Sequence, residues 1–568
     1  MRAARWVVRR GNPTKEEVLC RELGVRPKLA RLLVGRGHDT PEKASAFLEA
    51  KLSTQLRSPM LFRDMERAAD RVVRALTSGE RIGVFGDYDV DGIAGSAILV
   101  GFLRALGHDP ALYIPHRLRE GYGLSERGLR ALAAEGVRLV VTVDCGGASH
   151  REIAFAAEAG MDVIVCDHHQ VSETRLPALA VLNPVEPDAG FPFSGLCGAG
   201  VAFYLALGVR MRLRELGWSP LPDLRRFLDL VTLGTVADIV PMVEENRVLV
   251  RYGLREIEKS LRPGLAALKD VSGVSSVNTG VVGFRLAPRL NAGGRLADAT
   301  RGVELLVTPD AERARELARA LDEENRARQR IEDEILTEAL AMLEARDPRE
   351  RRTIVLGSPD WHPGVVGIVA SRLVDRFYRP TVLVGIDAAR GLGRGSCRSI
   401  PAVDVYAALR KCASLLEGFG GHKMAAGLSI RPEKLEEFGE RFEKAVREAT
   451  SPEDFVPRTL VDDELRAEEV ASALVEDLEQ LEPFGPGNPE PVFLLRGAEV
   501  VSRRVVGSNH LRLFLRQGEH ALSAIGFGMA ELGELESGST VDVLGVPERD
   551  DWSGGVRFRL KAVRPVAG

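Results

Sequence analysis

The chain has 568 residues, of which 45% are hydrophobic and 28% are charged, a composition that is ordinary for a globular protein. It contains no run near the roughly 18 uninterrupted apolar residues of a membrane-spanning helix, and its arginine-rich start lacks the apolar stretch of a signal peptide. The net charge of −4 argues weakly against a protein that coats nucleic acid, but not against a nuclease whose basic residues line one groove.

The cysteines are scattered, and no two of them form a Cys-x-x-Cys pair. This spacing argues against structural zinc and against a disulfide framework, and it predicts a cytoplasmic protein. The length is too great for one hydrophobic core, so three or four domains are expected. The cysteines are Cys20, Cys145, Cys166, Cys197, Cys397 and Cys412.

The first predicted elements are helices, in a region of about 60 residues that carries no motif. From Arg81 onward, short apolar runs alternate with helical patterns. Continuous apolar strands separated by helices are typical of a parallel sheet covered on both faces, which predicts an α/β fold. The strands are expected at 82–85, 111–114, 139–143 and 161–165, and the first intervening helix at 93–106.

The middle of the chain is predicted to be mostly helical from about 200 to 260. A charge-rich amphipathic pattern then runs from about 310 to 346. This long helix could link two domains, or it could be an ordinary packing helix with one solvated face. A second alternating unit is expected from 353 to about 449, and residues 451–454 have the composition of a linker.

The last region predicts a small β-barrel. Five short strands with turn residues between them are typical of a closed barrel of the oligonucleotide-binding fold. They are expected at 498–506, 511–516, 522–527, 541–545 and 556–563, after a helix at about 467–480. Some basic and aromatic residues there could bind a single strand, although each alone is more typical of a structural position. They are Arg503, Arg504, Arg512, Phe514 and Arg516.

Three acidic motifs each follow directly after a predicted strand. They are Asp87-Tyr88-Asp89-Val90-Asp91-Gly92, Asp144-Cys145-Gly146-Gly147 and Asp167-His168-His169, and Asp238 follows later. Ligands of parallel sheets bind beyond the carboxyl ends of the strands, so one crevice could collect these side chains. A single Asp-x-Asp-Gly is equally typical of a surface turn, and a single His-His pair of a cap or core. A structural explanation is much harder to give for the whole set.

Carboxylates with one or two imidazoles suit magnesium or manganese. Two such ions about 3.5–4 Å apart can activate a water and stabilise the leaving oxygen of a phosphoester. Asp89 and Asp91 are two residues apart and face the same way in an extended turn. Asp144, alone after the middle strand, would suit a carboxylate shared by two ions. The sequence therefore predicts a two-metal hydrolase that needs no separate protein base.

These motifs, with Ala237-Asp238-Ile239-Val240-Pro241-Met242, resemble the DHH phosphoesterase superfamily. The resemblance is strongest to the RecJ family of bacterial single-stranded-DNA-specific exonucleases, and it extends from about residue 60 to the C-terminus. It implies a parallel-sheet DHH domain and a second α/β domain, joined by a linker helix and followed by the barrel. The expected parts are a helical N-terminal extension at 1–60, the DHH domain at 61–308, the linker helix at 309–349, the DHH-associated substrate-binding domain at 350–450 and the oligonucleotide-binding fold at 451–568.

The resemblance also implies roles for the acidic and histidine residues. Asp144, His168 and His169 would be catalytic, with His169 placed to hold the scissile phosphate. Asp167 would orient its neighbours. The expected manganese or magnesium ligands are Asp87 (in a supporting place), Asp89, Asp91, Asp144, His168 and Asp238.

Two regions carry candidate DNA-binding arginines. Arg117, on the loop after the second strand, could contact a phosphate or be an ordinary surface arginine. The segment 286–295 combines glycines with Arg289 and Arg295, and such a loop suits close approach to a charged backbone. The resemblance implies that this region handles nucleic acid, and either arginine is a candidate.

The second alternating unit carries Arg394-Gly395-Ser396-Cys397-Arg398-Ser399 and Gly420-Gly421-His422. These segments resemble the DHH-associated domain. The resemblance implies that Ser396, Arg398 and His422 grip the 5′ end of the substrate.

Metal-dependent hydrolysis is predicted from the residues. The resemblance implies degradation of single-stranded DNA from the 5′ end to mononucleotides, in recombination and repair. It also implies a single-strand-binding protein and a RecQ-type helicase as partners. Nothing in the sequence demands more than a monomer. A basic passage between the two α/β units would exclude duplex by its width. Two alternatives stay open, a small-substrate phosphodiesterase and a non-catalytic scaffold. The region past Ala449 argues against the first, and the retained ligands argue against the second.

Overall fold

The residues described by the computed structural model are 4–172, 174–296, 298–344, 350–532, 535–550 and 554–566, and they fall into two compact units. The larger unit takes in Ser58–Asp238 and Gly253–Pro457. The smaller unit takes in Arg5–Arg57, Ile239–Tyr252 and the described residues from Arg458 onward. No helix of the described residues is long and apolar enough to cross a bilayer.

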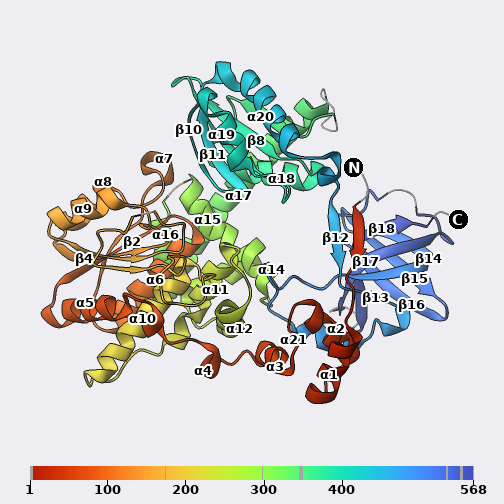
Figure 1. Ribbon diagram of the computed structural model, residues 1–568, viewed down its shortest axis with the longest axis horizontal. Helices are drawn as coiled ribbons and strands as arrows, with labels where there is room; N and C mark the ends of the chain where they lie inside the picture. Colours follow the sequence, from red (N-terminus) through yellow and green to blue (C-terminus); the bar gives the residue numbers. More distant parts are fainter. Residues whose placement is uncertain are drawn as a thin grey trace. The chain divides into compact units, whose positions relative to one another are not determined.

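The larger unit begins with the predicted parallel sheet, whose strand order is β3-β2-β4-β5-β6. Apolar side chains of β2, β4 and β5 are buried on both faces, as the continuous apolar runs indicated. α6 and α10 cover one face and α8 and α9 the other, which confirms the α/β fold (Figure 1). The elements are α5 (Met65–Ser78), β2 (Arg81–Gly86), α6 (Val90–Ala105), β3 (Ala111–Tyr113), α7 (Arg117–Glu120), α8 (Glu126–Ala134), β4 (Val137–Val143), α9 (His150–Glu158), β5 (Asp162–Cys166), β6 (Ala180–Leu182) and α10 (Gly198–Glu215).

A helical layer follows, as predicted, and leads into one long helix. α17 runs for 34 residues and packs against α13, α15 and α16, and also against α18 of the next domain. The helices are α11 (Leu228–Ala237), α12 (Glu244–Lys259), α13 (Pro263–Ser272), α14 (Thr279–Val281), α15 (Ala287–Leu296), α16 (Thr300–Val307) and α17 (Ala311–Glu344).

The glycine-containing segment 286–295 is helical, so the prediction of a flexible loop was wrong. A Cβ on Gly294 would lie 2.3 Å from the carbonyl oxygen of Tyr88. The glycine therefore allows α15 to pack closely against the first acidic motif, and it does not provide flexibility.

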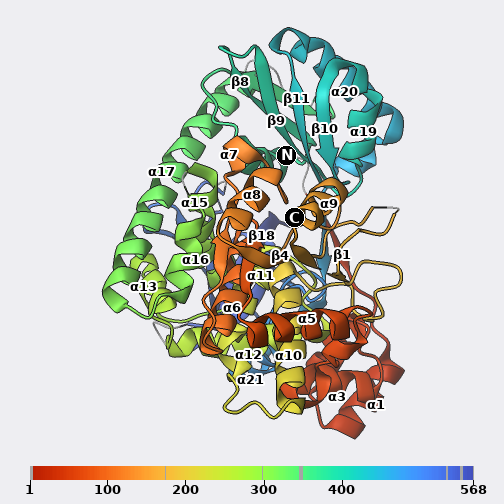
Figure 2. The ribbon, with the colours of Figure 1, turned by 90° about the vertical axis from the view of Figure 1, so that its left-hand side faces the viewer.

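The second α/β domain of the larger unit has a mixed sheet of order β10-β11-β9-β8-β7 (Figure 2). β7 and β8 are parallel and the other neighbours are antiparallel. α18 packs on one face of this sheet, and α19 and α20 pack on the other. The elements are β7 (Ile354–Ser358), α18 (Val366–Phe377), β8 (Thr381–Asp387), β9 (Leu392–Arg398), α19 (Val405–Lys411), β10 (Leu416–Gly421), β11 (Ala425–Ile430) and α20 (Leu435–Ala449).

The predicted barrel lies in the smaller unit. It closes because β14 pairs with β15 on one side and with β17 on the other. β14 starts five residues before the expected strand, since Phe493, Leu494 and Leu495 also belong to the buried core. The elements are β13 (Asp463–Leu465), α21 (Ser472–Gln480), β14 (Phe493–Val506), β15 (His510–Gln517), β16 (His520–Gly526), β17 (Thr540–Arg549) and β18 (Val556–Pro565).

The N-terminal region is helical apart from its first described element. β1 (Arg5–Val8) is a strand that pairs in parallel with β12 (Arg458–Val461), so the helical prediction was wrong there. The helices that follow share one apolar core with the barrel, including Leu29, Leu33 and Leu478. They are α1 (Pro13–Leu23), α2 (Pro27–Gly35), α3 (Pro41–Glu49) and α4 (Leu52–Gln55).

Candidate metal and phosphate site

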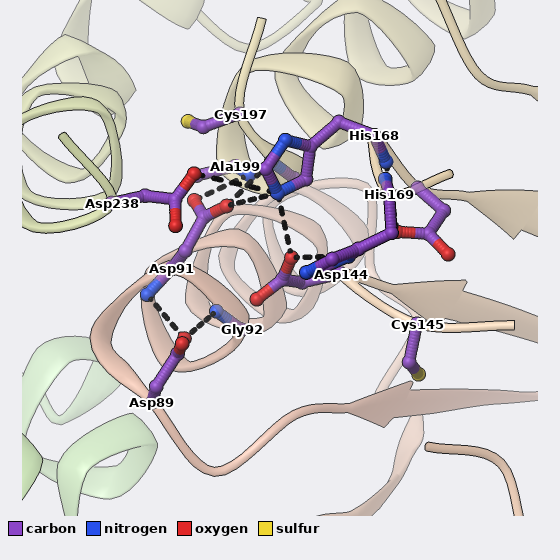
Figure 3. Close-up of polar contacts among 12 residues, drawn as sticks. Asp89, Asp91, Gly92, Asp144, Cys145, His168, His169, Cys197, Ala199 and Asp238 are labelled. Atoms are coloured by element: carbon purple, nitrogen blue, oxygen red, sulfur yellow. Dashed lines mark hydrogen bonds and ion pairs between the residues drawn. The ribbon is translucent and has the colours of Figure 1, made fainter. Parts of the chain in front are cut away.

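The acidic motifs meet at one edge of the parallel sheet (Figure 3). β2, β4 and β5 are parallel neighbours, so the residues that follow each strand leave the sheet at the same edge. These residues are Asp87, Asp144 and Asp167. Asp238 reaches the same place from another direction, as the residue that ends α11.

Two helix N-termini hold the first motif. Asp89 caps α6, because its Oδ1 accepts hydrogen bonds from the backbone N–H groups of Asp91 (2.9 Å) and Gly92 (3.1 Å). The carboxylate of Asp91 in turn accepts bonds from the N–H groups of Gly198 (2.5 Å) and Ala199 (2.9 Å) at the start of α10. A helix N-terminus favours negative charge, so these bonds fix the carboxylate of Asp91 in its buried position.

Asp144 occupies the centre of the site. Its backbone has φ 61°, the left-handed region that aspartate tolerates better than most residues. His168 Nε2 lies 3.1 Å from Asp144 Oδ1, 3.5 Å from Asp238 Oδ2 and 3.7 Å from Asp91 Oδ2. One imidazole therefore faces three carboxylates that come from three different elements.

The side chains form three overlapping triads. In each triad, one ligand atom from every member lies within 4.8 Å of the others. Asp144 belongs to two triads and so does His168, so the arrangement provides neighbouring ligand sets that share residues. The triads are Asp87–Asp89–Asp144, Asp91–His168–Asp238 and Asp144–His168–His169.

The electrostatics of this cluster favour a bound cation. Burial raises the pKa of Asp87 and Asp144 well above the usual range, and the negative charges of neighbouring aspartates raise it further. The same causes raise the pKa of Asp238 to about 8. Oδ1 of Asp87 is also buried without a hydrogen-bond partner. Among the described residues, Asp91, Asp144 and Asp238 form ion pairs only with histidines. A divalent cation would satisfy this buried oxygen and neutralise the repulsion.

Asp167 organises the histidine side of the site. Its Oδ1 accepts bonds from the backbone N–H of His168 (2.8 Å) and lies 2.9 Å from His169 Nδ1, and its Oδ2 accepts from Gly147 N (2.7 Å). Burial lowers the pKa of His169, but the bond to Asp167 and the surrounding carboxylates outweigh burial and raise it to about 9.

Tyr122 also reaches this side, although its residue type gave no sign of a role. Its hydroxyl donates to the carbonyl oxygen of Asp144 (3.0 Å) and lies 3.0 Å from His169 Nδ1. With Nδ1 of His169 engaged by Tyr122 and Asp167, Nε2 is the ring nitrogen left for a ligand.

Arginines gather beside the carboxylates. Arg117, at the start of α7, has its guanidinium 5.1 Å from the centre of the Tyr88 ring. Burial lowers the pKa of Arg295 to about 10, and the charges of Arg117 and Arg398 contribute, which places these guanidinium groups near one another. Arg398 donates to Ser396 Oγ (2.8 Å) on β9. Guanidinium groups that lie near one another favour a bound anion such as phosphate.

Two predicted substrate residues, Arg289 and His422, lie apart from this group of arginines. Arg289 is engaged elsewhere, since its Nε donates to Asp322 Oδ1 on α17 (2.9 Å), whereas Arg295 donates to the carbonyl oxygen of Gly364 (2.9 Å). His422 has an exposed side chain on the turn between β10 and β11. In the described part of the chain, neither Arg289 nor His422 contacts the carboxylate cluster.

On the barrel, the side chains of β15 alternate between core and solvent. Phe514 is 45% exposed, and the guanidinium of Arg512 lies 5.7 Å from the centre of its ring. Two other candidates have partners of their own, since Arg516 pairs with Glu499 (2.8 Å) and Arg503 donates to the carbonyl oxygen of Leu532 (3.1 Å). Arg512 also donates to Ser523 Oγ (3.4 Å), so the exposed ring of Phe514, with the guanidinium of Arg512 beside it, is the surface that could stack with a nucleic acid base.

Three family profiles match separate parts of the chain. They are the DHH family, N-terminal domain, at residues 81–235, the DHHA1 domain at 351–448 and the RecJ OB domain at 461–563. The single-stranded-DNA-specific exonuclease RecJ of Bacillus subtilis (strain 168) is 37% identical over 554 residues, which cover 97% of this chain and 69% of the relative. The protein of the same name from Escherichia coli (strain K12) is 38% identical, with 89% of each chain covered.

A solved structure is similar over the whole chain. The crystal structure of RecJ in complex with Mn²⁺ from Thermus thermophilus has a TM-score of 0.85 and 33% identity, and covers 100% of this chain and 81% of that one. The structure of RecJ in complex with Mg²⁺ from the same organism has a TM-score of 0.79 and 32% identity, and covers 99% and 79% of the two chains.

Proposed function

Because the chain belongs to the RecJ family of single-stranded-DNA-specific exonucleases, we propose that it degrades single-stranded DNA from the 5′ end and releases mononucleotides, in DNA recombination and repair. The set of overlapping carboxylate and imidazole triads beside a gathering of arginines carries the proposal. Such a pair of sites is what phosphodiester hydrolysis requires, a cation site for the reacting centre and an anion site for the rest of the substrate.

The cofactor is manganese or magnesium, the ions bound in the similar solved structures. We place two ions. One would be held by Asp87, Asp89 and Asp144, and the other by Asp91, His168 and Asp238. Such ions, when bound, lower the pKa of a coordinated water and neutralise charge on the reacting phosphate.

The chain's own residues position the substrate. His169 is held through Nδ1 by Asp167 and Tyr122, which leaves its Nε2 to donate a hydrogen bond to an oxygen of the scissile phosphate. Asp167 is not itself a ligand in this scheme, because both of its oxygens are engaged by the backbone N–H groups of Gly147 and His168.

The terminal phosphate would be bound by the arginine group. Arg117, Arg295, Ser396 and Arg398 are the proposed contacts, and Arg295 is preferred over Arg289 because the latter is held by an ion pair on α17. Binding of the 5′ phosphate at this place would set the polarity of degradation. His422, exposed at the β10–β11 turn, would join only when substrate is bound.

Single-stranded DNA is the binding partner that the family and the barrel support. Arg512 and Phe514 on the barrel would bind the strand beyond the reacting end. We further propose a monomer in the cytoplasm that works with a single-strand-binding protein and a RecQ-type helicase. The free thiols of all six cysteines are consistent with a reducing compartment.

The test uses the full chain with Mn²⁺ and a single-stranded oligonucleotide labelled at either end. Duplex DNA and a dinucleotide serve as control substrates. Mononucleotide release from the 5′-labelled strand at the earliest times, with little cleavage of blunt duplex, is the expected result. Cleavage of the dinucleotide alone would indicate a small-substrate phosphodiesterase, and binding without cleavage would indicate a scaffold.

A further inference from the structure

A pocket of about 560 Å³ opens at the carboxyl ends of β7 and β8, and the proposed hydrolysis of ordinary DNA makes no use of it. It is bounded by the loop that follows β7, by the end of β8 and by the start of β9. We call it the β7–β8 pocket and define it by its polar residues, which are Asp360, His362, Asp387, Arg390 and Arg394, with the apolar residues around them. Parallel strands bind ligands at their carboxyl ends, and this volume is typical of a small-molecule site.

The wall of the β7–β8 pocket is fixed in place. Trp361 is 3% exposed, and its Nε1 donates to Glu338 Oε2 on α17 (2.7 Å). A Cβ on Gly385 would lie 2.3 Å from the carbonyl oxygen of Trp361, so the loop rests directly on β8 only because residue 385 is glycine. The pocket is therefore part of the packed structure of the domain.

The β7–β8 pocket continues the proposed binding site of the 5′ phosphate. Residues 394, 396 and 398 alternate with the buried Cys397 along β9, so Arg394, Ser396 and Arg398 share one face of the strand. Four residues of strand span about 13 Å, so the backbone positions of Arg398 and Arg394 lie about that far apart. A short group that links the 5′ phosphate to a ligand in the pocket can span this distance. The side chain of Arg398 is directed along the strand towards Arg394, because it donates to the Oγ of Ser396, which lies between them in the sequence (2.8 Å).

Arg295 contacts the same loop from the other side. Its guanidinium donates to the carbonyl oxygen of Gly364 (2.9 Å), two residues after His362. A group attached to the 5′ phosphate would therefore pass Arg394 and enter the β7–β8 pocket.

The lining of the pocket defines that group. Asp387 is paired with Arg390, whose Nε lies 3.6 Å from its Oδ2, so Asp360 is the carboxylate that would repel a phosphate inside the pocket. Carboxylates also accept hydrogen bonds from ribose hydroxyls and exocyclic amino groups. His362 Nδ1 accepts from the backbone N–H of Gly364 (3.1 Å), so the neutral ring presents Nε2–H as a donor. Apolar walls complete a site suited to a nucleoside, with a cationic side chain at its entrance to bind a linking phosphate. The apolar lining residues are Pro359, Trp361, Pro363, Ile386 and Leu392.

We infer that the β7–β8 pocket holds a ribonucleoside joined to the 5′ phosphate of DNA through a pyrophosphate bond, so that 5′-nucleotidylated strands are substrates. The inference rests on the proposed function. Water adds to the phosphorus of the first internucleotide linkage, the P–O3′ bond breaks, and the 3′ oxygen leaves with a proton. The products are a dinucleoside pyrophosphate with a free 3′ hydroxyl and a shorter strand with an ordinary 5′ phosphate. The pyrophosphate bond stays intact.

The test compares a 5′-adenylated single strand with its 5′-phosphorylated counterpart, both labelled at the 3′ end, with the full chain and Mn²⁺. We expect kcat/KM for the two strands to agree within about tenfold, and mass spectrometry to find the adenylated dinucleoside pyrophosphate as first product. Arg394→Glu should lower the ratio of adenylated to phosphorylated kcat/KM by about tenfold or more, because a charge-assisted hydrogen bond is lost. Arg394→Gln should lower the ratio by a smaller factor.

Arg410→Glu is the matched control, since Arg410 is exposed on α19 of the same domain and does not line the pocket. It should leave the ratio unchanged. Asp387→Asn should reduce discrimination between an adenosine and a 2′-deoxyadenosine at the 5′ end. Cleavage of the phosphorylated strand alone, release of free AMP, or an unchanged ratio in Arg394→Glu would overturn the inference while the proposed function stands. Failure of both strands to react would remove the proposed function, and the inference with it.

Discussion

Gly198→Ala tests whether the contact between the start of α10 and the acidic cluster is as tight as the geometry requires. A Cβ at position 198 would lie 2.6 Å from the Cβ of Asp144, 2.9 Å from its Cα and 3.0 Å from Asp91 Oδ2. Non-bonded carbon atoms are normally about 3.5–4.0 Å apart, so either the helix or the strand end must move by roughly 1 Å. The substitution should destabilise the larger unit by about 1–3 kcal/mol, the usual range for overpacking.

The effect on hydrolysis should be larger than the loss of stability suggests. The N–H groups of Gly198 and Ala199 bind the carboxylate of Asp91, and Asp144 is the centre of the ligand triads. A displacement of about 1 Å at such a site can reduce the rate by ~10²-fold. We therefore expect kcat with Mn²⁺ and single-stranded DNA to fall by about that factor, at a temperature where circular dichroism shows the variant to be folded.

Gly200→Ala is the matched control, two residues further along the same helix. Its Cβ would lie 3.4 Å from Leu196 Cδ2, an ordinary contact, and alanine favours a helix over glycine by up to about 1 kcal/mol. This variant should keep wild-type kcat and equal or better thermal stability. Wild-type kcat and unfolding temperature in Gly198→Ala, or equal losses in both variants, would show that the contact between Gly198 and Asp144 is not tight.

Three further predictions concern single side chains. Tyr122→Phe removes the hydroxyl that lies 3.0 Å from His169 Nδ1 and should lower kcat about two- to tenfold in stopped-flow assays, the usual value of one hydrogen bond; an unchanged kcat would exclude this role. Arg295→Gln should raise KM for 5′-phosphorylated DNA about tenfold, whereas Arg289→Gln should mainly lower the unfolding temperature, and the reverse pattern would contradict the assignment. Burial lowers the pKa of His38 to about 4 from an ordinary value near 6.5, so the unfolded chain binds more protons than the folded chain between these pH values. The free energy of unfolding should therefore fall by up to about 3 kcal/mol as the pH drops through this window. His38→Gln should flatten that part of the pH profile of unfolding, and an equal slope in both proteins would exclude the effect.

The sheet and the position of its acidic cluster could be predicted because both depend on local patterns. Continuous apolar runs indicate parallel strands, and residues that directly follow such strands share one edge of the sheet. Asp87, Asp144 and Asp167 obey this rule, and the structure brings them together. Asp238 follows a helix, so the rule for strand ends does not place it, and the family resemblance gave the stronger reason to assign it to the site.

Other parts of the site depend on backbone geometry that residue types do not reveal. The N–H groups that bind Asp91 come from Gly198 and Ala199, and the glycine-rich start of α10 was the only sign of them. A choice between the two arginines of α15 as the substrate contact became possible only once the segment was known to be a helix. Six residues of helix turn the chain by about 600°, which places Arg289 and Arg295 on different faces.

Long-range pairing explains the missed strand at the N-terminus. The four residues of β1 pair with β12, about 450 positions away, and no local pattern of such a short segment could reveal that contact.

The metal centre is tested most directly by counting the Mn²⁺ ions bound to the wild-type chain and to Asp144→Asn, by calorimetric titration, and by measuring hydrolysis of 5′-phosphorylated single-stranded DNA on the same samples. Two ions per wild-type chain are expected. Asp144→Asn should lose at least one ion and at least ~10²-fold in rate while it still binds the strand. Two ions and wild-type turnover in Asp144→Asn would show that the cluster around Asp144 is not the metal centre.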